Sequence, residues 1–199
     1  MAEQLRIWAG LQGFLSLAAL VALVLFFLLA TPFTSVQTQW MWLGPVNDWL
    51  SVFSAVPWIV AMIVLTLRIN AGTGLWILTL LACLGVTALA VVTLLMLAGR
   101  ASLQAQSVIA VVAMTVALAW GAVAAPAASR AAAIPPWLSF FAIGLLVAFI
   151  LGAVLAGVGY LLHAGSSAQM PLYIVAATVG GLAWCAFPVW WLAVASTAR

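Results

Sequence analysis

Residues 137–162 read WLSFFAIGLLVAFILGAVLAGVGYLL, and this stretch decides the fold because no charged side chain interrupts it. A helix needs about 20 consecutive apolar residues to cross the hydrocarbon layer of a membrane. A helix that is hydrophobic on every side is buried either in a large protein or in a lipid bilayer. A chain of 199 residues has no interior large enough to enclose several such helices. We therefore interpret the stretch as a transmembrane helix.

Comparable apolar runs fill the rest of the chain. Together with the first they predict six membrane spans, at about 7–30, 48–69, 74–97, 103–125, 137–162 and 170–194. Hydrophobic residues make up 69% of the chain and charged residues 4%, whereas a typical soluble domain carries about 25% charged residues. Because little chain is left between the runs, the sequence predicts one all-α domain over residues 1–199, a bundle of six transmembrane helices.

The few charged residues stand at the ends of the runs and predict how the chain is threaded. The acids are Glu3 and Asp48, and the bases are Arg6, Arg68, Arg100, Arg130 and Arg199. Basic residues collect in cytoplasmic loops, so an inside N-terminus leaves Arg100 as the one arginine outside. We therefore predict that both termini are cytoplasmic. The arginines stand singly and form no basic patch, which argues against a nucleic-acid partner.

Small residues recur at every fourth position in residues 137–162, where Gly144, Ala148, Gly152 and Ala156 share one helix face. Lipid tails are as apolar as leucine, so close backbone approach, not hydrophobicity, holds membrane helices together. We interpret this face as a packing surface within the bundle, with docking of a separate subunit as the alternative. Similar spacing in the fourth and sixth runs predicts that the last three helices form the tighter half of the bundle.

Prolines and glycines predict kinks and helix ends. Pro57 and Pro188 fall inside apolar runs and are expected to kink their helices. Pro126 is expected to end the fourth helix, so that an Ala-rich loop runs to the fifth. In the short connection at 70–74, glycine is expected to adopt the positive φ that a tight reversal needs.

Asp48 is the one acid away from the N-terminus, and it follows a Gly44-Pro45 pair that is expected to break helical structure. We expect Asn47 or Asp48 to cap the second helix. The alternative role for Asp48 is a proton or cation site at the outer mouth. Arg100 is predicted on the same side of the membrane, and an isolated ion near lipid is costly, so we predict an outer ion pair between Asp48 and Arg100.

His163 is the sole histidine and is predicted at the outer end of the fifth span. A lone imidazole is a candidate axial ligand for haem or another pigment, although an interfacial polar residue is the plainer interpretation. It makes no zinc site, which takes three or four protein ligands. Cys83 and Cys185 lie mid-span without CxxC spacing and are interpreted as small buried side chains. We predict no catalytic residue and no metal site.

Tryptophan is abundant, with 11 residues. Trp190 and Trp191 are among those expected in the aromatic belt at the membrane surface, whereas Trp58 and Trp120 fall inside runs and are expected to pack the core or to line a pocket. A short echo joins WLSVF at 49–53 to WLSFF at 137–141, each at the predicted start of a span. If genuine, it would relate the two halves as the inverted repeat found in many transporters.

Absent residues exclude several functions. All five basic residues are arginine, so a retinal Schiff base, a pyridoxal enzyme and a Walker A phosphate loop are ruled out. No predicted span core holds the chain of acids or histidines that proton-coupled carriers usually carry.

Three hypotheses for function remain. The first is a non-catalytic accessory or structural subunit of a larger membrane complex, with membrane-protein partners and with lipid or pigment contacts. The second is a small transporter or channel for a neutral or apolar solute. The third is a membrane enzyme that acts on lipid, with Asp48 or His163 as its acid–base group. The Arg-only, Ala- and Gly-rich composition favours the inner (plasma) membrane of a bacterium.

Overall fold

The computed structural model describes residues 1–30, 38–162 and 166–199, and every regular element within these ranges is helical. The elements are α1 (Ala2–Leu25), the π-helical turn η1 (Phe26–Ala30) that continues it, α2 (Leu43–Arg68), α3 (Thr73–Leu97), α4 (Leu103–Arg130), α5 (Trp137–Leu161) and α6 (Gln169–Thr197). Six of the described helices are long and apolar enough to cross a membrane. The predicted all-α bundle of six membrane-spanning helices is therefore confirmed.

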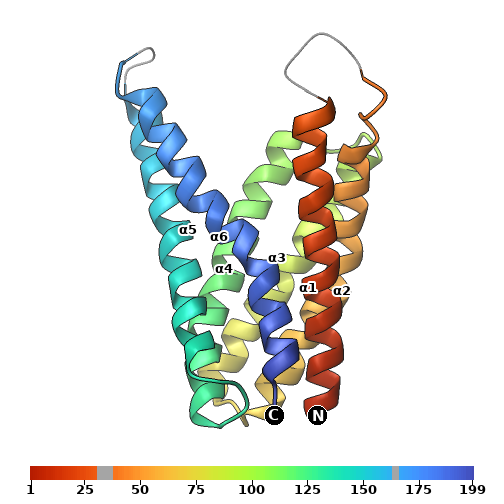
Figure 1. Ribbon diagram of the computed structural model, residues 1–199, viewed down its shortest axis with the longest axis vertical. Helices are drawn as coiled ribbons and strands as arrows, with labels where there is room; N and C mark the ends of the chain where they lie inside the picture. Colours follow the sequence, from red (N-terminus) through yellow and green to blue (C-terminus); the bar gives the residue numbers. More distant parts are fainter. Residues whose placement is uncertain (31–37, 163–165) are drawn as a thin grey trace.

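The helices form a ring in chain order, because each packs on the next and α6 returns to pack on α1 (Figure 1). Both termini lie at one end of the bundle, here called the terminal end, and the connections α2–α3 and α4–α5 lie there too. The helix bounds place Arg6, Arg68, Arg130 and Arg199 toward this end and Arg100 at the opposite, far end. That the terminal end is cytoplasmic stays a prediction.

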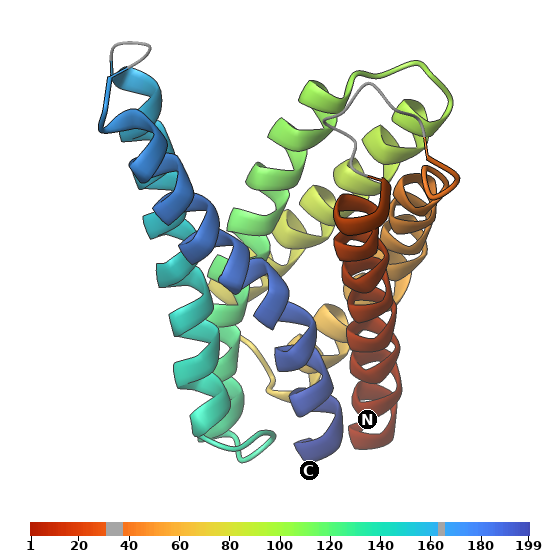
Figure 2. The same cartoon turned by 45° about the horizontal axis from the view of Figure 1, so that its top comes forward.

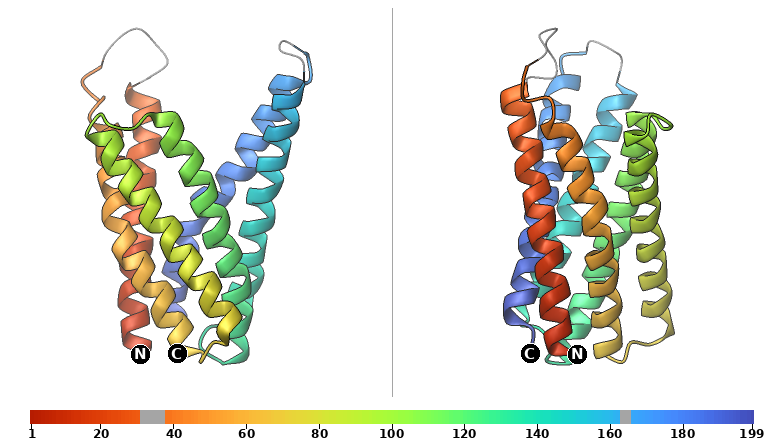
Figure 3. Two further views of the ribbon diagram at one scale, coloured as in Figure 1. Left: turned by 180° about the vertical axis from the view of Figure 1, so that it is seen from behind. Right: turned by 90° about the vertical axis from the view of Figure 1, so that its right-hand side faces the viewer.

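The ring is closed at the terminal end and opens toward the far end. Figures 1 and 3 show α5 and the first half of α6 leaning away from the other helices, and Figure 2 shows α4 parting from α5 in the same direction. Burial follows this shape: in α6, Ala176 is the only buried residue before Ala183, whereas buried residues are frequent from Ala183 to Val194. We call α5 with residues 169–182 of α6 the splayed hairpin.

That the last three helices form the tighter half of the bundle stays a prediction. The most extensive helix contacts are those within the pairs α5–α6 and α1–α2, and α4 packs less extensively on α5. Small-residue spacing shows which face of a helix can approach another closely, but it does not identify the neighbour. In this fold α5 uses that capacity mainly against α6.

Two predicted helix boundaries are corrected by prolines that stay inside helices. Helix α2 begins at Leu43, so Pro45 lies in its first turn, where its missing N–H would have had no intrahelical partner. Asn47 and Asp48 therefore stand in the second turn and do not cap the helix. Helix α4 continues through Pro126 to Arg130, because alanine, the best helix former, surrounds that proline.

The α2–α3 reversal uses a residue other than the predicted glycine. Asn70 has the positive φ of 47°, and Gly72, with φ of −70°, stands just before α3. Asparagine tolerates this left-handed conformation better than most residues do. Pro57 and Pro188 lie inside continuous helices, and the kinks expected there stay predictions.

Candidate functional site at the convergence of the helices

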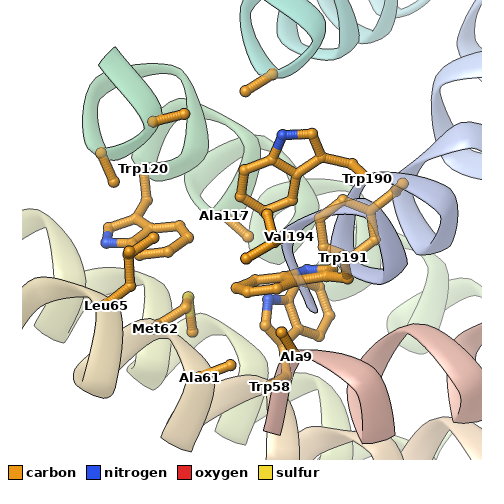
Figure 4. Packing of buried hydrophobic residues seen from close by; sticks show 14 of the residues in the cluster. Ala9, Trp58, Ala61, Met62, Leu65, Ala117, Trp120, Trp190, Trp191 and Val194 are labelled. Atoms are coloured by element: carbon orange, nitrogen blue, oxygen red, sulfur yellow. The ribbon is translucent and has the colours of Figure 1, made fainter. Parts of the chain in front are cut away.

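An aromatic core fills the terminal half of the bundle, and we define it as Trp58, Trp120, Phe187, Trp190 and Trp191 (Figure 4). Trp191 is its centre: its ring centroid lies 4.8 Å from that of Trp190, 5.9 Å from that of Trp120 and 6.3 Å from that of Phe187. Trp58 completes the set, with its centroid 4.9 Å from that of Phe187. Rings from α2, α4 and α6 thus close the centre of the ring of helices.

Two of these tryptophans overturn a prediction. Trp190 and Trp191 were expected in the interfacial belt, but they are 1% and 0% exposed. Helix α6 runs on to Thr197, so both indoles lie inside the bundle and not at its edge. For Trp58 and Trp120, the packing interpretation is confirmed, since both are buried in the core.

Hydrogen bonds tie the aromatic core to neighbouring helices. The Trp120 indole N–H donates to Thr79 Oγ1 on α3 at 2.9 Å, and Thr79 Oγ1 lies 2.9 Å from Thr66 Oγ1 on α2. The Trp190 indole N–H donates to the carbonyl of Leu138 on α5 at 3.0 Å. Water is absent from a bilayer core, so each polar group left unpaired there would destabilise the fold by roughly several kcal/mol. These hydrogen bonds avoid that cost.

Three other buried polar atoms, on α1, α2 and α6, have no such partner among the described residues. Within the described residues, Gln12 Oε1, Trp58 Nε1 and Trp191 Nε1 are buried without a hydrogen bond. Gln12 is 0% exposed, and its amide nitrogen donates to Ser16 Oγ at 2.9 Å. Figure 4 shows the Trp58 and Trp191 indoles side by side next to Ala9 of α1. Among the described residues, one acceptor on α1 and two donors, one on α2 and one on α6, therefore stand unpaired inside the bundle.

A line of polar residues on α2 leads from the far end toward this point. Asn47, Ser51, Ser54 and Trp58 follow one another at helical spacing and so share one face. Ser51 Oγ donates to the Asn47 carbonyl at 2.9 Å, and Ser54 Oγ donates to the Ser51 carbonyl at 2.8 Å. Sequence reasoning did not relate these four residues to one another, although their spacing of four and three places them on one helix face.

The structure gives Asp48 and Arg100 hydrogen bonds other than the predicted outer ion pair between them. The Asn47 side-chain amide donates to Asp48 Oδ1 at 3.1 Å, and the backbone N–H of Arg100 donates to the Leu95 carbonyl at 2.7 Å. Pairing of Asp48 with Arg100 stays a prediction. His163 lies outside the described residues, so its predicted ligand role is untested.

The small-residue face of α5 divides into a packed part and an open part. A Cβ added at Gly152 would lie 2.7 Å from the Cα of Gly180 on α6, so the two backbones are in direct contact. Ala148 and Ala156 are half-buried. Gly144 is exposed, and a Cβ added there would meet nothing within 4 Å. One helix face thus serves the α5–α6 contact and also leaves a small residue without a neighbour.

A second small-residue face lies on α6. Near the terminal end α6 packs on α1, where a Cβ added at Gly10 would lie 3.6 Å from the Cβ of Ala195. Leu192 of α6 also faces α1, because a Cβ added at Gly13 would lie 2.7 Å from its Cγ. From Leu192, steps of seven, four and four residues extend this side of α6 upward through Cys185, Gly181 and Ala177. There, Cys185 and Ala177 are exposed, and a Cβ added at Gly181 would meet nothing within 4 Å. We call these three residues the open face of α6.

The core has little free volume for a ligand. A cavity of about 10 Å³ lies between α4, α5 and α6, beside Trp120, Gly121 and Trp190, and it is at most large enough for one water molecule. Among the described residues, no three His, Cys, Asp or Glu side chains come together as a metal site. Cys83 is half-buried and Cys185 exposed, and both thiols are free.

No family model, curated protein or solved structure matches this chain.

Proposed function

We propose that this chain is a non-catalytic subunit of a larger membrane complex, in the inner membrane of a bacterium, and that its splayed hairpin holds a transmembrane helix of a partner. The observation that carries the proposal is the open face of α6. The side of α6 that packs on α1 near the terminal end continues through the small residues Gly181 and Ala177, where no described residue lies within 4 Å of a Cβ added at Gly181 and Ala177 is exposed. A partner helix placed there would extend an interface that already exists within the chain.

The position of Gly181 in the middle of α6 supports the proposed docking of a partner helix. Relative to alanine, each such glycine costs roughly 0.5–1 kcal/mol, and membrane helices recover this cost where the missing side chain lets another backbone approach. Gly152 has such a neighbour in Gly180, whereas Gly157 and Gly181 of the splayed hairpin have nothing within 4 Å of an added Cβ. A helix docked on the open face of α6 would give Gly181 the same role that Gly152 has.

The experiment is purification of the tagged chain from its native membrane in mild detergent, with substitutions on the open face. Wild type is expected to co-purify with at least one membrane protein in fixed ratio. Gly181→Leu fills the open face and is expected to lower the yield of that complex by about tenfold, the effect of roughly 1.4 kcal/mol at the interface. Cys185, cross-linked in a Cys83→Ala background, should link to the same partner.

A matched control lies on the opposite side of the same helix stretch. Val175 is 48% exposed and points away from the open face by helical spacing, so Val175→Leu should leave the complex intact. A monodisperse monomer without a stoichiometric partner would refute the proposal. Equal loss of the complex in Gly181→Leu and Val175→Leu would refute the assigned surface.

A small transporter for a neutral or apolar solute is the second candidate, favoured by a different observation. The aromatic core closes one half of the bundle while the helices diverge in the other half, which is the asymmetry expected of a carrier open to one side. Trp49–Phe53 and Trp137–Phe141, the echoed segments, also share stacked ring pairs with interplanar angles of 25° and 22°. Reconstituted vesicles that take up a neutral solute only when they contain the chain would favour this candidate.

A further inference from the structure

A recess of about 230 Å³ lies at the terminal end, between the last turns of α4 and the first turns of α5. It is separate from the aromatic core and from the open face of α6. Helix α4 and the α4–α5 connection form one wall of the recess, and α5 forms the other. The lining residues are Pro126, Ser129, Arg130, Pro136, Ser139, Phe140 and Ile143.

The recess offers hydrogen-bond donors, one from each wall, that no described residue of the protein uses. Ser139 is 8% exposed, and its hydroxyl has no partner within the described residues. Arg130 is exposed, and in the part of the chain that the structure describes its guanidinium makes no ion pair. Ser139 also stands in the first turn of α5, where the helix dipole favours an anion.

Beyond Ser139, the α5 wall of the recess is apolar and exposed. Phe140 is 76% exposed and Ile143 is 41% exposed, and both lie on α5, which is apolar enough to span a membrane. The recess therefore combines a cation, two hydroxyls and a hydrocarbon-like wall at the end of a membrane helix. A free inorganic anion would use only the first two of these features.

We propose that this recess binds the head group of an anionic phospholipid from the leaflet at the terminal end. The Arg130 guanidinium and the Ser139 hydroxyl donate to the phosphate, as arginine does at other phosphate sites, and Ser129 offers another hydroxyl. An acyl chain lies along Phe140 and Ile143. Basic pockets between membrane helices on the cytoplasmic side are suited to anionic lipids, which agrees with the predicted threading.

Nearby charge supports the same ligand. The Arg6 Nε–H donates to the carbonyl of Ala198 at 2.8 Å, and the backbone N–H of Arg199 donates to the carbonyl of Ala133, in the α4–α5 connection, at 3.1 Å. These contacts bring two further arginines to the end of the bundle that holds the recess. Their positive charge attracts an anionic head group to this end over a distance of about 8–10 Å.

The test measures lipid affinity in neutral detergent. Short-chain phosphatidylglycerol is titrated into the purified protein, and the thermal midpoint is followed by tryptophan fluorescence. Wild type should be stabilised by phosphatidylglycerol more than by phosphatidylcholine or inorganic phosphate. Arg130→Gln should weaken phosphatidylglycerol binding by about tenfold, and Ser139→Ala by about threefold, as expected for the loss of one charge-assisted hydrogen bond.

Two controls separate a built site from general attraction or misfolding. Arg68→Gln removes the same charge at the α2–α3 connection of the same end and should change affinity by less than about twofold. Ser139→Ala should not destabilise the lipid-free protein, because the hydroxyl has no partner to lose. Equal weakening by Arg68→Gln, or equal binding of phosphatidylcholine, would overturn the site, and equal stabilisation by inorganic phosphate would overturn its assignment to lipid.

Discussion

In the terminal half of the bundle, indole rings from α2, α4 and α6 gather around Trp191, whereas in the far half α6 has one buried residue, Ala176, over residues 169–182. The terminal half is held by ring stacking and by directional hydrogen bonds such as Trp120 to Thr79. The far half of the hairpin is held mainly by the contact of α5 with α6, through Gly152 and Gly180.

This difference separates two tasks within one chain. Buried polar contacts in a membrane specify one arrangement of helices, because no water replaces a lost partner. Small-residue faces, by contrast, allow close approach without specifying which helix approaches. The terminal half is therefore suited to maintaining the fold, and the far half is suited to receiving another molecule.

The largest expected effect is a disulfide cross-link between α1 and α6 that forms in the terminal half of the bundle and does not form in the far half. In a background with Cys83 and Cys185 replaced by alanine, Gly10→Cys with Ala195→Cys should form a disulfide, because a Cβ at Gly10 lies 3.6 Å from that of Ala195 and disulfides need about 3.5–4.5 Å. The register of this contact, extended along both helices, sets Val24 opposite Gly181. Val24→Cys with Gly181→Cys should remain reduced.

The mobility of the two double-cysteine variants on a gel under oxidising conditions shows whether each pair forms a disulfide. Efficient cross-linking of the Val24 and Gly181 pair would show that the far half closes as tightly as the terminal half. The comparison between the halves would then fail, and with it the free surface assigned to a partner.

The contact within the splayed hairpin gives the next largest effect. Gly152→Ala should destabilise the protein by about 2–3 kcal/mol, since the new Cβ would lie 2.7–2.9 Å from backbone atoms of α6 that have no room to move. Gly144→Ala, where nothing lies within 4 Å, should instead stabilise by about 0.5–1 kcal/mol. Reversible unfolding in mixed detergent micelles measures both, and equal effects would contradict the assigned contact.

A substitution in the aromatic core should have a smaller cost. Trp120→Phe keeps an aromatic ring but removes the indole N–H that donates to Thr79, and about 1–2 kcal/mol of stability should be lost. Trp137→Phe is the matched control because Trp137 is 50% exposed at the start of α5, and it should change stability by less than about 0.5 kcal/mol. A larger loss in Trp137→Phe would mean that the core does not dominate stability.

A substitution at Gln12 is expected to change stability by about 1 kcal/mol, as a gain and not a loss. Gln12 Oε1 is buried without a partner among the described residues, and an unsatisfied buried acceptor costs about 1–3 kcal/mol. Replacing Gln12 with methionine, similar in volume, should raise stability by about 1 kcal/mol, after loss of the Ser16 hydrogen bond is counted. A clear loss of stability would show instead that Gln12 Oε1 holds a partner such as a buried water molecule.

Sequence reasoning located the six membrane helices but misjudged details that depend on neighbours. Proline was treated as a helix breaker at Pro45 and Pro126, yet each lies within a helix, the first in an N-terminal turn and the second in an alanine-rich stretch. Trp190 was assigned to the interface because the end of α6 was placed too early. Each error concerns a residue whose preference was outweighed by its surroundings.

The candidate sites divide in the same way. Gly152 was identified by its spacing, because the period of an α-helix is fixed and shows which residues share a face. The sequence did not show that Gly180 is its partner, that Gln12 Oε1 is unpaired, or that a recess lies at Ser139. Each of these depends on which segments distant in the chain become neighbours.

The amino-acid sequence alone determined that this chain lies in a membrane and crosses it with six helices, because the number of consecutive apolar residues is fixed by the thickness of the hydrocarbon layer. The tertiary structure decided which faces meet, that Trp191 lies at the centre, and that α5 and α6 lean away from the rest. Nearly every residue of the spans is apolar, so hydrophobicity cannot rank one helix pairing over another, and shape and a few buried hydrogen bonds make that choice.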